Sequence, residues 1–67
     1  MEDTYIAEYS VLIDGAVWGR EEHSFYAENE EEARKEAHRI EEEYSSKRKE
    51  LLLDYIWNND GDMIEVS

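Results

Sequence analysis

The stretch FYAENEEEARKEAHRIEEEY, residues 25–44, contains the strongest helix signals in the chain. Asn29 is a favourable N-cap residue, and Glu32 follows three positions later, as in a capping box. The three glutamates after Asn29 fill the first turn, where the helix dipole favours negative charge. These signals predict that a helix begins directly after Asn29.

The same stretch carries one apolar stripe, because Ala33, Ala37, Ile40 and Tyr44 recur at helical spacing. The small alanines allow this helix to lie close to a sheet. We expect Glu30–Arg34 and Glu31–Lys35 to form i,i+4 ion pairs on its outer side. The helix is expected to end near Ser45-Ser46 or within Lys47-Arg48-Lys49, since basic residues suit a helix C-terminus.

Two strands are predicted before this helix. Residues 5–13, YIAEYSVLI, are rich in β-branched and aromatic types, and alternation places Tyr5, Ala7, Tyr9, Val11 and Ile13 on one face. Asp14-Gly15 is a strong hairpin signal, because both residues tolerate positive φ. Residues 16–27 form the return strand, and its polar middle at 19–22 is expected to bulge or bend at the glycine.

A second hairpin is predicted after the helix. Residues 50–57, ELLLDYIW, place Leu51, Leu53, Tyr55 and Trp57 on one face, and Asp60-Gly61 repeats the turn signal. Met63, Ile64 and Val66 return as a short last strand. The fold class is therefore α+β, with one amphipathic helix packed on an antiparallel sheet in the order ββαββ. The alternative is ββαβ, in which a longer helix continues from Ser46 through Tyr55.

Length and composition indicate one small domain, residues 1–67. A chain of this size buries only about 60% of the surface that its unfolded form exposes, so a homodimer is one way to complete the core. There is no cysteine, which excludes disulfides and agrees with a cytoplasmic location. The acidic start lacks the features of a secretory signal, and we expect it to be the natural N-terminus. No stretch approaches the roughly 20 apolar residues of a membrane span.

No motif indicates catalysis, a cofactor or a metal. The acidic run near Asp60 does not match a Ca²⁺ loop, because a glycine at loop position six would place Ile56 at position one. His23 and His38 lack the spacing of a zinc site. The three basic residues 47–49 form no phosphate-binding surface beside a net charge of −12. We expect neither an enzyme nor direct binding of nucleic acid.

The acidic excess is the most informative feature. Nineteen acidic residues stand against seven Lys and Arg, and charge of this size attracts basic surfaces. Acids on alternate strand residues lie roughly 6.6 Å apart, and i,i+4 helix acids roughly 5–6 Å apart, near the spacing of successive phosphates. The plainer interpretation is a solvated face that confers solubility. The predicted partner contacts are Glu21, Glu22, Glu28, Glu31, Glu32, Glu36, Glu42 and Glu43.

In size, charge and element order the chain resembles small acidic proteins of phages and mobile elements, of the anti-CRISPR or anti-restriction kind, several of which are DNA mimics. The phrase FYAENEEEARKEA is similar to a strand-then-helix phrase common in such proteins. The resemblance implies an inhibitor without cofactor that blocks the nucleic-acid site of a basic effector subunit in the host cytoplasm.

The alternative is a non-enzymatic interaction module, a dimer or an antitoxin-like protein. It would act through an apolar edge strand, either residues 5–13 or residues 62–66.

Overall fold

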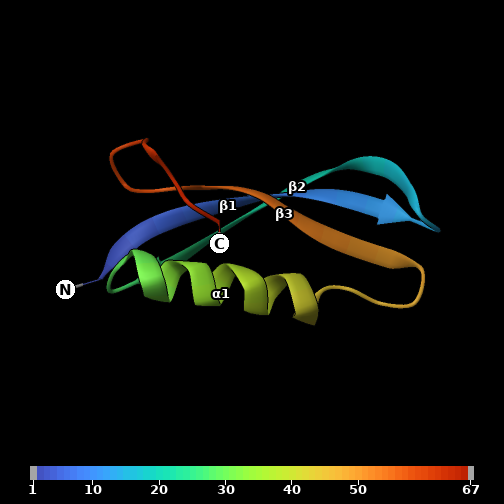
Figure 1. Cartoon of the computed structure of the whole chain (residues 1–67), viewed down its shortest axis with the longest axis horizontal. Coiled ribbons are helices and arrows are strands. Elements are labelled where there is room, and N and C mark those ends of the chain that lie inside the picture. The colour runs from blue at the N-terminus through green and yellow to red at the C-terminus, as the bar shows by residue number, and fades with distance from the viewer. Residues whose placement is uncertain (1, 67) are drawn as a thin grey trace.

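The computed structural model describes residues 2–66 and contains four strands and one helix (Figure 1). The elements are β1 (Asp3–Ile13), β2 (Ala16–Ala27), α1 (Glu30–Glu43), β3 (Lys49–Trp57) and β4 (Met63–Ile64). The strands form one antiparallel sheet in the order β2-β1-β3-β4. The α+β class and the order ββαββ are confirmed, although β4 has only two residues. The alternative with a helix from Ser46 to Tyr55 is wrong, because most of that segment is strand β3.

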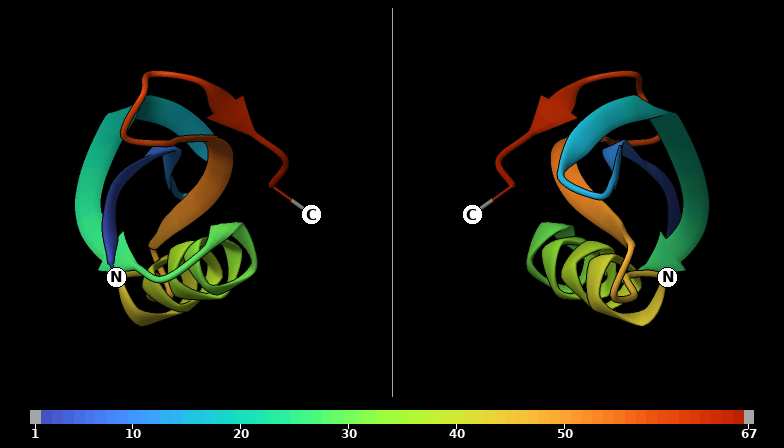
Figure 2. Two further views of the ribbon diagram at one scale, coloured as in Figure 1. Left: turned by 90° about the vertical axis from the view of Figure 1, so that its left-hand side faces the viewer. Right: turned by 90° about the vertical axis from the view of Figure 1, so that its right-hand side faces the viewer.

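The molecule has two layers, with α1 lying along one face of a strongly curved sheet (Figure 2). The opposite face carries no covering element within residues 2–66, and we call it the open face. The overall shape is elongated, 39 × 19 × 18 Å. The helix does not reach the length and apolarity that a membrane span requires.

The core lies between the sheet and α1. Tyr5, Ala7, Tyr9 and Val11 of β1 are buried, as the alternation predicted. On the helix, Ala33 and Ala37 are fully buried and Ile40 nearly so, which confirms the predicted stripe up to its last turn. Phe25, Ala27, Leu51, Ile56 and Ile64 complete the cluster. Alanine at the contact positions lets the helix axis approach the sheet closely.

The first hairpin turns at Asp14 (φ 51°) and Gly15 (φ 83°), both in the left-handed region that the sequence signal requires. The β1–β2 register shifts opposite Val11 and Leu12, which leaves Trp18 without a partner on β1. The predicted irregularity thus lies directly before Gly19. Trp18 is the extra residue of this bulge, and its side chain is exposed.

A second bulge, at Asp54, changes which side chains of β3 face the helix. Tyr9 pairs with Leu53 and Glu8 pairs with Tyr55, so Asp54 is the extra residue. Leu51, Leu53 and Ile56 therefore face α1, while Tyr55 and Trp57 lie on the open face. The prediction that Leu51, Leu53, Tyr55 and Trp57 share one face of the strand is wrong. The extra residue of the bulge reverses the alternation of side chains in the residues that follow it.

The helix begins as predicted and ends earlier than predicted. The Asn29 side chain accepts a hydrogen bond from the Glu32 amide at 2.9 Å. The last helical residue is Glu43, with Tyr44 as C-cap and no basic residue in the last turn. Residues 47–49 instead lie in the connection and at the start of β3, where Arg48 bonds Asp14 at 3.0 Å.

Strand order decides which edges are free. β1 lies between β2 and β3, so residues 5–13 are not an edge, and that expectation is wrong. The outer strands are β2 and the short β4 at residues 63–64, and β4 covers only the last part of β3.

Candidate functional site

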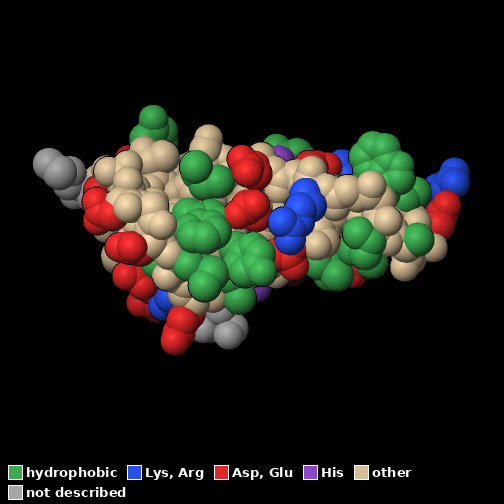
Figure 3. All heavy atoms as spheres, turned by 90° about the horizontal axis from the view of Figure 1, so that it is seen from above, with side chains coloured by type: hydrophobic (Ala, Val, Ile, Leu, Met, Phe, Trp, Pro, Cys, Tyr) green, Lys and Arg blue, Asp and Glu red, His purple; other side chains and the backbone are tan. Residues whose placement is uncertain are grey.

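The open face joins an apolar patch to a group of charged side chains (Figure 3). Ile6, Tyr55, Trp57 and Met63 form the apolar patch, and strand register makes them neighbours. Ile6 lies opposite Trp57, and Trp57 lies opposite Met63. Ile6 and Tyr55 are each 39% exposed and Met63 is 58% exposed, so water still reaches a substantial part of this patch.

Glu8 and Glu22 stand directly opposite each other on the open face. The Trp57 indole Nε1 donates a hydrogen bond to the Glu8 carboxylate. Within residues 2–66, neither glutamate has a cationic side chain within 4 Å. Like charges at directly opposed positions are unfavourable, so this pair would gain from an added cation.

Further along the same face, Arg20 approaches Asp54 at 3.9 Å, and the Ser10 hydroxyl also donates to Asp54. This carboxylate thus has partners within the chain, in contrast to Glu8 and Glu22.

Helix acids on the flank toward β2 are largely neutralised by the helix itself. Arg39 makes two hydrogen bonds of 2.7 Å to Glu36 and a further ion pair with Glu43. Lys35 lies 3.5 Å from Glu32. The bonds from Arg39 hold the pKa of Glu36 below its ordinary value. Among the described residues, Glu30–Arg34 and Glu31–Lys35 do not come within 4 Å, so these two predicted pairs are wrong.

Three consecutive basic residues, 47–49, lie near the end of the molecule where β1 turns into β2. Arg48 pairs with Asp14 at 3.0 Å, and this bond raises the pKa of the Arg48 guanidinium. Lys49 pairs with Glu21 at 2.7 Å, and its hydrogen bond lowers the pKa of the Glu21 carboxyl. At the other end, Asp3, Glu30 and Asp60 line one shallow hollow. Charge is therefore unevenly distributed along the long axis.

The eight predicted contact residues do not lie on one surface. Glu28, Glu32 and Glu36 line one hollow beside the start of the helix, and Glu43 follows on the same flank. Glu31 and Glu42 lie on another side of α1, beside His38. Glu21 lies on the helix side of the sheet, whereas Glu22 lies on the open face, because neighbouring strand residues point to opposite faces. Their role in binding stays a prediction.

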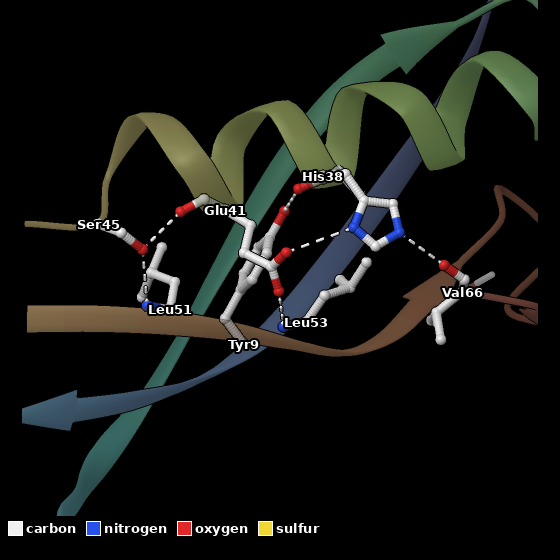
Figure 4. A network of polar contacts seen from close by, with 8 residues as sticks. Tyr9, His38, Glu41, Ser45, Leu51, Leu53 and Val66 are labelled. Atoms are coloured by element: carbon white, nitrogen blue, oxygen red, sulfur yellow. Dashed lines mark hydrogen bonds and ion pairs between the residues drawn. The ribbon is translucent and has the colours of Figure 1, made fainter. Parts of the chain in front are cut away.

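A polar network joins α1 to β3, and the sequence did not predict it (Figure 4). The Glu41 carboxylate accepts a hydrogen bond of 2.6 Å from the Leu53 amide. Glu41 also lies 3.4 Å from His38, and the other nitrogen of His38 is 2.8 Å from the Val66 carbonyl oxygen.

The Ser45 hydroxyl donates to the Glu41 carbonyl at 2.7 Å and accepts from the Leu51 amide at 3.1 Å. Side chains thus satisfy amides along the part of β3 that β4 does not cover. No local motif marks Glu41 among the many glutamates of the helix.

Within residues 2–66, no three His, Asp or Glu side chains are grouped so that they could hold a metal ion. Comparison with protein-family models, curated proteins and solved structures found no match to this chain.

Proposed function

We propose that this protein is a non-enzymatic acidic inhibitor that binds a basic, nucleic-acid-binding protein and occupies its DNA or RNA site. In this proposal the partner is an effector subunit of a CRISPR system or another defence enzyme, in the cytoplasm of a host cell. Binding requires no cofactor, because the inhibitor acts by steric exclusion and charge.

The supporting observation is the surplus of acids that the chain cannot neutralise. Ion pairs engage seven of the nineteen acidic residues, which leaves twelve without a Lys, Arg or His within 4 Å among residues 2–66. Five of the seven Lys and Arg residues are already in those pairs. The unpaired carboxylates are available to Lys and Arg of a partner that ordinarily grips phosphates.

Glu31 and Glu42 represent this surplus on one side of α1, because both line the same hollow, both are exposed and neither has an ion-pair partner within the described part of the chain. Asp60 and Glu65 provide a matched control. They are also exposed and without such a partner, but they lie in and beyond the last hairpin, outside the predicted contacts. Each double variant to Gln or Asn changes the net charge by the same amount.

The test is capture from a nuclease-treated host lysate by the tagged protein, with elution by rising salt and identification of the bound protein. We expect a basic nucleic-acid-binding protein that elutes at moderate salt, since screening weakens exposed charge pairs. E31Q/E42Q should weaken its binding by about tenfold, on the scale of one to two exposed ion pairs, and D60N/E65Q much less. A partner that resists high salt, or capture of no basic nucleic-acid-binding protein, would contradict the proposal, whereas equal effects of the two variants would exclude this side of the helix as the contact.

A further inference from the structure

The open face presents two neighbouring rows of side chains with different chemistry. In one row, Glu22, Glu8 and Tyr55 lie side by side on β2, β1 and β3. In the next row, Ile6, Trp57 and Met63 lie side by side on β1, β3 and β4. The first row is acidic and ends on an aromatic ring, and the second is apolar.

The distances between these rows match an extended peptide. Neighbouring strands are about 4.8 Å apart, and residues two positions apart along a strand are separated by roughly 6.6 Å. A cation placed between Glu8 and Glu22 would therefore lie about one and a half strand spacings, roughly 7 Å, from the Tyr55 backbone. The long side chains of Tyr55 and of an Arg or Lys can close this gap to a cation–π contact. An apolar side chain two positions further along the partner would reach Ile6 and Trp57.

The Glu8 carboxylate is already oriented for such a contact. Its bond from the Trp57 indole restrains one oxygen, and its half-buried position makes it less mobile than a free surface glutamate. Glu22 is exposed and can adjust to an incoming side chain. The two acids thus lie beside apolar surface, and a partner that covers this surface would exclude water and strengthen its ion pairs with them.

We propose that the open face is the docking surface for a basic segment of the partner, with Arg or Lys between Glu8 and Glu22 and an apolar residue two positions away on Ile6 and Trp57. This inference rests on the proposed function and names its binding surface. It differs from charge mimicry by the helix, because an apolar contact accompanies the charge.

Charge favours this occupant over a second copy of the chain. Besides Glu8 and Glu22, register places Glu50 on the open face, and Asp54 lies there as well, whereas Arg20 is the one Lys or Arg of the described strand residues on this face. Two copies packed through this face would bring these acids together, each on a molecule of net charge −12. A basic segment meets the same surface with complementary charge.

Trp57 can report binding directly. Trp18 is 77% exposed at the β2 bulge, apart from the apolar patch, so W18F leaves Trp57 as the only tryptophan. The probe is the synthetic ten-residue peptide RRVVRRVVRV, in which an Arg and a Val repeatedly stand two positions apart and so share one face of the extended chain. The control peptide has the same composition but strictly alternates Arg and Val, so that residues two positions apart are identical. Fluorescence of Trp57 is titrated in physiological salt.

We expect saturable binding of the probe peptide and binding at least several-fold weaker for the alternating control peptide. In the W18F background, E8Q/E22Q should weaken binding by about tenfold, whereas D60N/E65Q should change it less than about threefold. Equal effects of the two variants, or equal affinity for the two peptides, would show diffuse attraction and overturn the inference. Concentration-dependent dimerisation that E8Q/E22Q strengthens, measured by sedimentation, would identify a second copy as the occupant and also overturn it.

Capture of the basic partner separates this inference from the proposed function. If E31Q/E42Q loses the partner while E8Q/E22Q retains it, the helix is the contact and the open face is not. If no variant and no wild-type protein captures a basic protein, the proposed function itself fails.

Discussion

Tyr9 joins the two layers of the molecule through a single hydroxyl. Its side chain is fully buried, and its hydroxyl donates a hydrogen bond of 2.7 Å to the Ala37 carbonyl of α1. Burial is the main reason that the pKa of Tyr9 is raised, and nearby Glu41 adds to the effect. The phenol is thus held in its neutral, donating form at the centre of the core.

Replacement of Tyr9 by Phe should cost about 1 kcal/mol of unfolding free energy, because the change removes a buried hydrogen bond and keeps the ring. Urea denaturation followed by circular dichroism measures the difference. Y5F is the control, since Tyr5 is also a buried tyrosine of β1 but its hydroxyl has no hydrogen bond within residues 2–66. A loss as large in Y5F as in Y9F would contradict this account of Tyr9.

At the scale of single residues, strand alternation is predictable and side-chain pairing is not. The burial of Tyr5, Ala7 and Tyr9 follows from a period of two, which is a property of the backbone. The partner of Arg39 depends on rotamers, and Arg39 joins Glu36 and Glu43. The opposite directions of Glu21 and Glu22 were implicit in the same alternation, although both were predicted as partner contacts.

Side chains from α1 and from the connection after it accept hydrogen bonds from amides of β3, a strand that β4 pairs only in part. β4 pairs only with Ile56 and Trp57, so the amides of Leu51 and Leu53 rely on other partners. Ser45 and Glu41 supply them. Since an amide left unsatisfied in a partly buried place is costly, this network holds the helix against the sheet edge.

Glu41→Ala should therefore destabilise the fold by about 1–3 kcal/mol, since it leaves the Leu53 amide without its acceptor. The measurement is urea denaturation of the variant beside Glu42→Ala. Glu42 is the adjacent residue of the same helix, exposed, with no ion pair among residues 2–66. Equal stability of the two variants would show that the Glu41 contact contributes nothing.

At the scale of elements, the sequence predicted the features that depend only on neighbouring residues, namely a helix start and a hairpin turn. The N-cap at Asn29 and the turn at Asp14-Gly15 each depend on a few adjacent residues. The bulge at Asp54 and the internal place of β1 depend on which strands pair, and that is set by contacts far apart in sequence. The apolar patch was missed for this reason, because Tyr55 and Trp57 reach the open face only after the bulge.

The whole molecule carries a charge of −12 on 67 residues, and self-repulsion of this size opposes compaction. The fold accommodates it through ion pairs at one end and along the helix flank. The remaining carboxylates stay exposed or half-buried on the surface, where an external cation can reach them. A surface of this kind suits a protein whose neutralising partner is another molecule.

Stability of the free protein should accordingly rise with salt, because ions screen repulsion among the unpaired carboxylates more than they weaken the few exposed pairs. The measurement is the melting temperature by circular dichroism from low salt to about 0.5 M NaCl, where the Debye length has fallen below 8 Å. A melting temperature that falls throughout this range would show that the internal ion pairs outweigh the repulsion.

The most direct test of the central claim is competition for the captured basic partner. Labelled duplex DNA or RNA is bound to that partner, and its fluorescence anisotropy is followed while the acidic protein is added. The account predicts that the protein displaces the nucleic acid completely, and that higher salt weakens its binding. Simultaneous binding of nucleic acid and acidic protein, with unchanged anisotropy at saturating protein, would contradict it.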